Sequence, residues 1–186
     1  MSRRTTLPAL ALLATLSVAA CSSPGAEGPQ ATPPPEESAT DSGTAIEEPR
    51  DISTVTDACT LLTEEQLSGL GGAGSTPAVE ESEYGQPKCR WSNDNYSVSV
   101  ALFDGGGADV IFTKPDINRV DVGGYPAGHR PGNDRLCRVE VLVAEYQQID
   151  VSYSRYGGET PELKDTCGMA QKLATEAVKN LPAASS

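Results

Sequence analysis

The sequence has few basic side chains, and this shortage excludes one class of partner. Its 14 Lys and Arg side chains stand against 26 Asp and Glu side chains, which gives a formal net charge of −12. Proteins that bind nucleic acids need Lys and Arg to neutralise phosphates, so this balance argues against a nucleic-acid partner. It also disfavours electrostatic docking on anionic lipid headgroups. The length of 186 residues leaves room for one domain.

Recognisable catalytic and metal-binding motifs are also missing. The chain contains neither G-x-S-x-G nor H-E-x-x-H, and its single histidine, His129, lies in a loop among Gly and Pro. The Asn93-Asp94-Asn95 segment is too short for a calcium loop, which spreads its oxygen ligands over about twelve residues. Asp104-Gly105-Gly106-Gly107 lacks the Lys-Ser/Thr ending of a phosphate-binding loop and indicates a flexible turn. The sequence therefore predicts no cofactor, no metal site and no enzymatic activity.

No apolar run is long enough to cross a bilayer. The longest candidate covers only the 14 residues from Leu7 to Ala20, whereas a spanning helix needs roughly 20. This run follows Arg3 and Arg4 and ends in Leu16-Ser17-Val18-Ala19-Ala20-Cys21. Small residues directly before a cysteine form a bacterial lipobox, in which the peptidase cuts before the cysteine and its thiol receives diacylglycerol. We expect residues 1–20 to be a lipoprotein signal peptide and Cys21 to be the lipidated residue.

The mature chain is predicted to be tethered to a membrane by its lipid. Loss of the signal peptide removes two arginines and leaves 12 basic against 26 acidic side chains, a net charge of −14. A diacylglyceryl group, with palmitate-type chains, supplies the two acyl chains that stable anchoring takes. Residues 21–51 are rich in Pro, Ser and Glu and cannot bury a core, so they are predicted to form a disordered tether. The expected location is the outer, extracytoplasmic face of the cell membrane; whether export uses the Sec or the twin-arginine route stays open.

Four cysteines remain in the mature domain. An even number of cysteines in an exported domain indicates disulfide bonds, and the absence of a C-x-x-C pair disfavours a thiolate metal site. Each half of the domain offers one cysteine beside a helix and one beside a strand. The economical pairing is Cys59 with Cys89 and Cys137 with Cys167, and two other connectivities remain open.

The folded domain is predicted to span residues 52–182, followed by a tail at 183–186. Thr63-Glu64-Glu65-Gln66 is a capping box that begins a helix of about two turns. Residues 72–87 and 129–133 are predicted loops, and residues 108–113 a short helix. Alternation of apolar and polar residues predicts strands in five segments: 89–91, 96–103, 120–127, 137–143 and 149–153, the last two joined by a turn near 147–148.

The chain is predicted to close with a long helix. Thr160 and Pro161 suit its N-cap and first position, and apolar residues recur at helical spacing as far as Leu181, before Pro182. This apolar stripe should cover the apolar face of the sheet. The predicted fold class is α+β: a mainly antiparallel sheet with a short N-terminal helix, a longer C-terminal helix packed on it, and two disulfides.

Together these motifs resemble a known family. Those that carry the resemblance are the lipobox with its Pro-rich spacer, Asp57-x-Cys59-x-Leu61-Leu62-Thr63, Cys89-x-Trp91, Gly124-x-Pro126-Ala127, Cys137-x-Val139-x-Val141 and Cys167-x-x-Ala170-x-x-Leu173-Ala174. The set is similar to the actinobacterial secreted lipoproteins called domain of unknown function 3558, and more loosely to extracellular sensor domains of mycobacterial receptor kinases. The family often has Pro where Ala58 and Thr166 stand here. The resemblance implies no activity and no catalytic residues.

A candidate binding face can be assembled from polar and loop positions: Arg90, Tyr125, His129, Arg130 and Tyr156. We expect a non-enzymatic, sensor-type module that binds an envelope protein or a small ligand. One alternative is an envelope hydrolase or transferase, which would need a pocket that brings His129 beside a hydroxyl or a carboxylate. Another is a structural accessory subunit of a membrane complex, with a stable partner and no ligand pocket.

Overall fold

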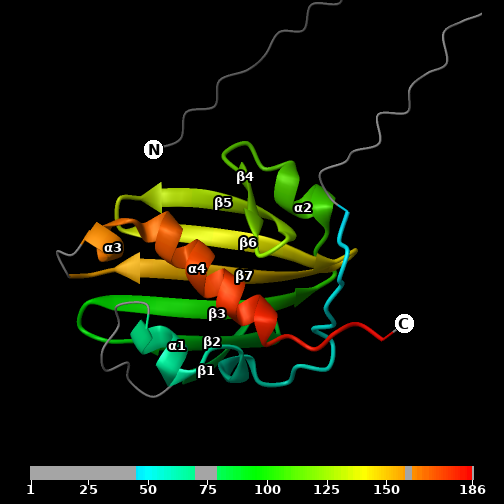
Figure 1. The fold of residues 1–186 in the computed structure, drawn as a ribbon, viewed down its shortest axis with the longest axis horizontal. Helices are drawn as coiled ribbons and strands as arrows, with labels where there is room; N and C mark the ends of the chain where they lie inside the picture. The colour runs from blue at the N-terminus through cyan, green and yellow to red at the C-terminus, as the bar shows by residue number, and fades with distance from the viewer. Residues whose placement is uncertain (1–44, 70–78, 158–160, 186) are drawn as a thin grey trace, which may run out of the picture. The chain divides into compact units, whose positions relative to one another are not determined.

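The computed structural model describes residues 45–69, 79–157 and 161–185. The predicted signal peptide, Cys21 and most of the predicted tether lie outside these residues. The described chain forms a seven-stranded, wholly antiparallel sheet with the strand order β1-β2-β3-β7-β6-β5-β4. Figure 1 shows helix α4 lying across one face of this sheet. The predicted α+β fold class is confirmed.

The elements follow one another along the chain in a simple order. They are η1 (Ala58–Leu61, a 3-10 helix), α1 (Glu64–Gly69), β1 (Val79–Glu83), β2 (Gln86–Ser92), β3 (Tyr96–Asp104), α2 (Ala108–Phe112), β4 (Asn118–Val122), β5 (Tyr125–Asn133), β6 (Leu136–Ala144), β7 (Gln147–Arg155), α3 (Pro161–Lys164) and α4 (Thr166–Lys179). Because side chains alternate along a strand, each strand contributes to both faces of the sheet.

The core lies between the sheet and α4. Alternate residues of the central strands are fully buried on this side, and α4 contributes Met169, Ala170, Leu173, Ala174, Ala177 and Val178. The Cys59–Cys89 disulfide links η1 to β2, and the Cys137–Cys167 disulfide links β6 to α4. Both predicted pairings are confirmed, and both bonds tie a helical segment to the sheet.

The predicted capping box is also confirmed. The Gln66 backbone N–H donates to Thr63 Oγ1 at 3.1 Å, and the Thr63 backbone N–H donates to Gln66 Oε1 at 2.9 Å. The Gln66 side chain also donates to Glu176 of α4 at 3.0 Å. The cap therefore connects the short helix to the long one as well as starting it. The glycines predicted to end this helix, Gly71 and Gly72, lie outside the described residues.

The predicted loop at 72–87 is wrong in its second half. Residues 79–83 form the edge strand β1, and β2 already begins at Gln86. Tyr84 and Gly85 make the turn between them with φ values of 52° and 80°. The sequence does not predict this strand, because Val79-Glu80-Glu81-Ser82-Glu83 shows almost no alternation of apolar and polar residues. An edge strand can tolerate such a sequence, since its partner β2 supplies cations that pair with the glutamates.

The predicted loop at 129–133 is wrong as well, because these residues belong to β5. The predicted strand at 120–127 is in fact two strands, β4 and β5, joined at Gly123 and Gly124 with φ values of 63° and 91°. Pairing with β4 on one side and β6 on the other holds β5 extended despite its Gly and Pro content. Gly128 is needed there, because a Cβ atom at this position would lie 2.4 Å from Ile117.

The predicted C-terminal helix is interrupted once. Asp165 ends α3 and caps α4, where its Oδ1 accepts the Gly168 backbone N–H at 2.9 Å. The helix stops at Lys179, before Pro182, and Thr160 lies outside the described residues. The turn between β6 and β7 falls at Glu145-Tyr146, because Gln147 and Gln148 already pair within the sheet.

Candidate functional site

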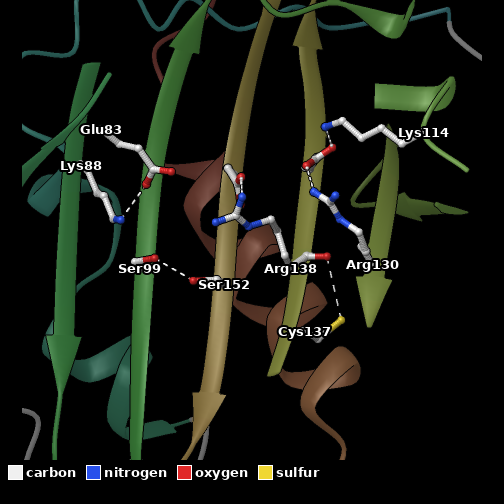
Figure 2. A network of polar contacts seen from close by, with 10 residues as sticks. Glu83, Lys88, Ser99, Lys114, Arg130, Cys137, Arg138 and Ser152 are labelled. Atoms are coloured by element: carbon white, nitrogen blue, oxygen red, sulfur yellow. Dashed lines mark hydrogen bonds and ion pairs between the residues drawn. The ribbon is translucent and has the colours of Figure 1, made fainter. Parts of the chain in front are cut away.

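The face of the sheet opposite α4, called here the open face, carries charged and hydroxyl side chains (Figure 2). Its central feature is a line of direct cross-strand partners that runs over five strands. This arginine–serine row consists of Arg130 on β5, Arg138 on β6, Ser152 on β7, Ser99 on β3 and Arg90 on β2. Two arginines thus face each other across β5 and β6, next to two serines.

An acidic pair lies beside this row. Glu140 on β6 and Asp150 on β7 are direct cross-strand partners on the same face. They lie two residues from Arg138 and Ser152, respectively. Like charges directly opposite each other destabilise a sheet. Here each is compensated diagonally, Glu140 by Arg130 and Asp150 by Arg138. The arginines and the acids therefore form two diagonal ion pairs, one between β5 and β6 and one between β6 and β7.

Glu140 is the better compensated of the two acids. Its side chain is only 3 % exposed and accepts hydrogen bonds from Lys114 Nζ at 2.5 Å and from Arg130 Nη2 at 3.0 Å. Lys114 follows α2, which packs against β5 and β6 where Gly128 leaves space for Ile117 and Ile111. Two cations on one buried carboxylate is the kind of pairing that makes its burial tolerable.

Asp150 forms an ion pair with one cation, Arg138, and two acids act on it. Burial raises the pKa of its carboxyl to about 7, and the negative charges of Glu140 and Glu83 act in the same direction. Arg138 and Lys114 oppose this pKa rise. The Arg138 ion pair, at 3.3 Å, is too weak to offset burial because the Arg138 side chain is itself 40 % exposed to screening solvent. This carboxyl therefore changes its protonation state near neutral pH instead of in acid.

The serines of the row leave room above the sheet. Ser99 and Ser152 share a hydrogen bond of 2.7 Å between their hydroxyl oxygens. Beside them lies a hollow of about 570 Å³, lined by Asp116, Arg130, Gly132, Leu136, Arg138 and Ser152. Small-molecule sites commonly have volumes of about 300–1,000 Å³. The hollow is therefore large enough for an organic ligand.

The far end of the row is closed by ion pairs at the sheet edge. Lys88 Nζ lies 2.6 Å from Glu83 Oε2 and 3.8 Å from Glu81 Oε2. Arg90, whose side chain is half exposed, also pairs with Glu81. The glutamates of β1 therefore neutralise the cations of β2. The arginines that line the hollow are Arg130 of β5 and Arg138 of β6.

The five predicted binding residues do not form one face. Arg90 and Arg130 lie on the open face, and Tyr156 is exposed just beyond β7. Tyr125 is buried, and its hydroxyl donates to the Glu48 carbonyl and accepts from Arg50 Nε. It holds the N-terminal segment against the sheet, a structural role that its position in the sequence did not indicate.

His129 points toward α4 instead of the open face. Its Nδ1 lies 2.8 Å from Gln171 Nε2. Among the described residues, no hydrogen bond or ion pair joins His129 to a hydroxyl or carboxylate. The arrangement required by the enzyme alternative is thus not formed by this part of the chain.

Sequence reasoning missed Arg138, Glu140, Asp150 and Ser152 as site residues. A signal was present, because Arg138 and Glu140 alternate with the buried valines of β6 and so point away from the core. Their partners on β5 and β7 depend on strand order and register, which one strand's sequence does not contain.

Residues 45–69, 79–157 and 161–185 contain neither a cluster of the metal-binding type nor a membrane-spanning helix. No group of three or more His, Cys, Asp or Glu residues is arranged there to hold a metal ion. None of the helices in these ranges is long and apolar enough to cross a bilayer.

Comparison with known proteins places the chain in a family. A family model described as "Protein of unknown function (DUF3558)" matches residues 16–180. The chain belongs to the DUF3558 family. No curated protein and no solved structure matches it. The DUF3558 match includes both disulfides and all seven strands, so the open face lies within the family's own region.

Proposed function

We propose that this DUF3558 protein is a non-enzymatic, lipid-anchored binding module on the outer face of the cytoplasmic membrane. Its open face binds an envelope ligand or partner. The observation that carries the proposal is the hollow in which two guanidinium groups and a serine hydroxyl meet. The lipobox ending at Cys21 supports the anchor, and the two disulfides are of the kind that persist in exported proteins.

The position of the acidic pair favours binding over catalysis. Two carboxyls side by side, one of them with a raised pKa, could serve as acid and base. However, neither Glu140 nor Asp150 lines the hollow, and both are almost fully buried against arginine or lysine. They hold the guanidinium groups in place instead of facing a substrate.

The anchor is tested by fractionation and mass spectrometry of intact cells that express the wild type or Cys21→Ser. The wild type should be found in the membrane fraction with an acylated N-terminal cysteine, and Cys21→Ser should be released. If the wild type were soluble and carried no acyl chains, the anchor would be refuted.

The binding face is tested by proximity crosslinking in the same cells. Arg130→Gln/Arg138→Gln should lose the crosslinks that the wild type makes to envelope material. Arg135→Gln, an exposed arginine in the β5–β6 turn, is the matched control and should keep them. Equal crosslinking by the wild type and the double variant would contradict the proposal.

A further inference from the structure

The paired arginines of the row are held in an arrangement that a sheet would not adopt for stability alone. Arg130 and Arg138 are direct cross-strand partners, and neighbouring like charges in this position repel. Each uses one terminal nitrogen for a buried carboxylate, Arg130 Nη2 for Glu140 and Arg138 Nη1 for Asp150. The buried carboxylates of Glu140 and Asp150 therefore hold the guanidinium groups of both arginines in place.

The remaining donors of these arginines are available to the hollow. A guanidinium has five N–H donors, and its planar fork matches an oxyanion such as a carboxylate or phosphate. The side chains of Arg130 and Arg138 remain 38 % and 40 % exposed, and both line the hollow. Their fixed positions lower the ordering cost of binding an anion.

The rest of the lining indicates what the anion is attached to. The hollow is much larger than one water molecule's share of about 30 Å³, so an inorganic anion would leave most of its 570 Å³ unfilled. Ser152 offers a hydroxyl and Asp116 a carboxylate that can accept hydrogen bonds from ligand hydroxyls. The other lining residues, Gly132 and Leu136, provide no aromatic ring on which a flat aromatic ligand would stack.

We infer that the hollow binds an acidic saccharide unit, a sugar whose carboxylate or phosphate lies between Arg130 and Arg138 and whose hydroxyls meet Ser152 and Asp116. This inference rests on the proposed function, because it names the ligand class of the same site. The shared chemistry is an oxyanion on a polyhydroxylated ring.

Binding of the acidic saccharide should depend on pH through Asp150. This carboxyl faces Arg138 and Glu140 from β6, Glu83 from β1 and Lys114 from the segment after α2. When it takes up a proton as the pH falls through about 7, a negative charge next to Arg138 disappears. The affinity for a sugar carboxylate should therefore rise severalfold between pH 8 and pH 6, and Asp150→Asn should remove this dependence.

The test is a solution titration of the whole mature chain carrying Cys21→Ser, in which binding is measured by changes in NMR chemical shifts. The probes are galacturonate for the carboxylate, glucose 6-phosphate for the phosphate, glucose as the neutral sugar, and inorganic phosphate. At least one acidic sugar should bind at millimolar concentration, and about tenfold more tightly than glucose or inorganic phosphate. The stronger of the two acidic probes identifies the anionic group.

The variants locate the binding. Arg130→Gln/Arg138→Gln should weaken binding of the acidic sugar at least about tenfold, whereas Arg135→Gln should bind as the wild type does. The inference is overturned if neither acidic sugar binds, if glucose binds equally well, or if the double variant retains wild-type affinity. Failure here, combined with loss of envelope crosslinks by the double variant in cells, would reject the saccharide but keep the binding module. Failure of both experiments would reject the proposed function.

Discussion

The two faces of the sheet are built from alternate residues of the same strands, and they have opposite properties. Val139 is completely buried against α4, while Glu140, the next residue, faces the other way and is held by Lys114 and Arg130. On the helix side, valines, tyrosines and two disulfides form a closed core. On the open face, arginines, serines and the two acids occupy the positions of the row and of the acidic pair beside it.

This difference separates what stabilises the fold from what is available for binding. Apolar burial contributes about 25 cal/mol for each Å² removed from water. Buried ion pairs often contribute nothing compared with apolar residues of similar size. The helix side therefore accounts for stability. The diagonal ion pairs of the open face are better explained by a need to position Arg130 and Arg138.

The largest effect is expected from Asp150. Its folded-state pKa of about 7 lies above the unfolded value of about 3.9, so the folded protein holds the proton more tightly. The resulting stability is fully present below about pH 4 and is lost as the pH rises through 7. Between pH 4 and 8 the free energy of unfolding of the wild type should fall by about 4 kcal/mol relative to Asp150→Asn.

Urea unfolding at a series of pH values measures this difference. Asp134→Asn, an exposed aspartate in the β5–β6 turn, is the control and should follow the wild type. Parallel pH curves for the wild type and Asp150→Asn would mean that folding does not raise the pKa of Asp150.

The disulfides of the helix side should come next. Both close loops with a sequence separation of 30 residues, so each should contribute about 3–4 kcal/mol. Cys137→Ala/Cys167→Ala and Cys59→Ala/Cys89→Ala should therefore be destabilised to a similar degree in chemical unfolding. A loss below about 1 kcal/mol for either double variant would show that packing alone holds that helix to the sheet.

A smaller loss is expected from the core of α4. Leu173 is 1 % exposed against the sheet, and Leu173→Ala should lower the free energy of unfolding by about 3 kcal/mol. Its exposed neighbour Lys172 gives the matched control, because Lys172→Ala should change stability by no more than about 0.5 kcal/mol. Thermal melting measures both variants. Similar losses of stability for Leu173→Ala and Lys172→Ala would contradict the packing described for this helix.

Much of the helix side could be predicted from sequence. The capping box, the apolar stripe of α4 and the alternation of β6 and β7 are local patterns, and all three are present. Placing each cysteine beside a helix or a strand favours the pairing of Cys59 with Cys89, although sequence alone leaves two other connectivities open. The strands that escaped prediction, β1 and most of β5, lack apolar alternation and exist because neighbouring strands pair with them.

The open face could be predicted only in part. The outward direction of Arg138 and Glu140 was visible in β6, but the meeting of Arg138 with Arg130, Ser152 and Asp150 requires the register of three strands. The raised pKa of Asp150 depends on burial and on distant Glu83, neither of which a local pattern reveals.

The most direct test of the separation between the faces measures stability and binding on the same samples of Arg130→Gln/Arg138→Gln. Replacing these half-exposed arginines should lower the free energy of unfolding by less than the roughly 3–4 kcal/mol expected for a lost disulfide, because Glu140 keeps Lys114 and Asp150 can take up a proton. The affinity for the acidic saccharide should fall at least about tenfold. A variant that unfolds as readily as one lacking a disulfide, or that binds like the wild type, would contradict the account.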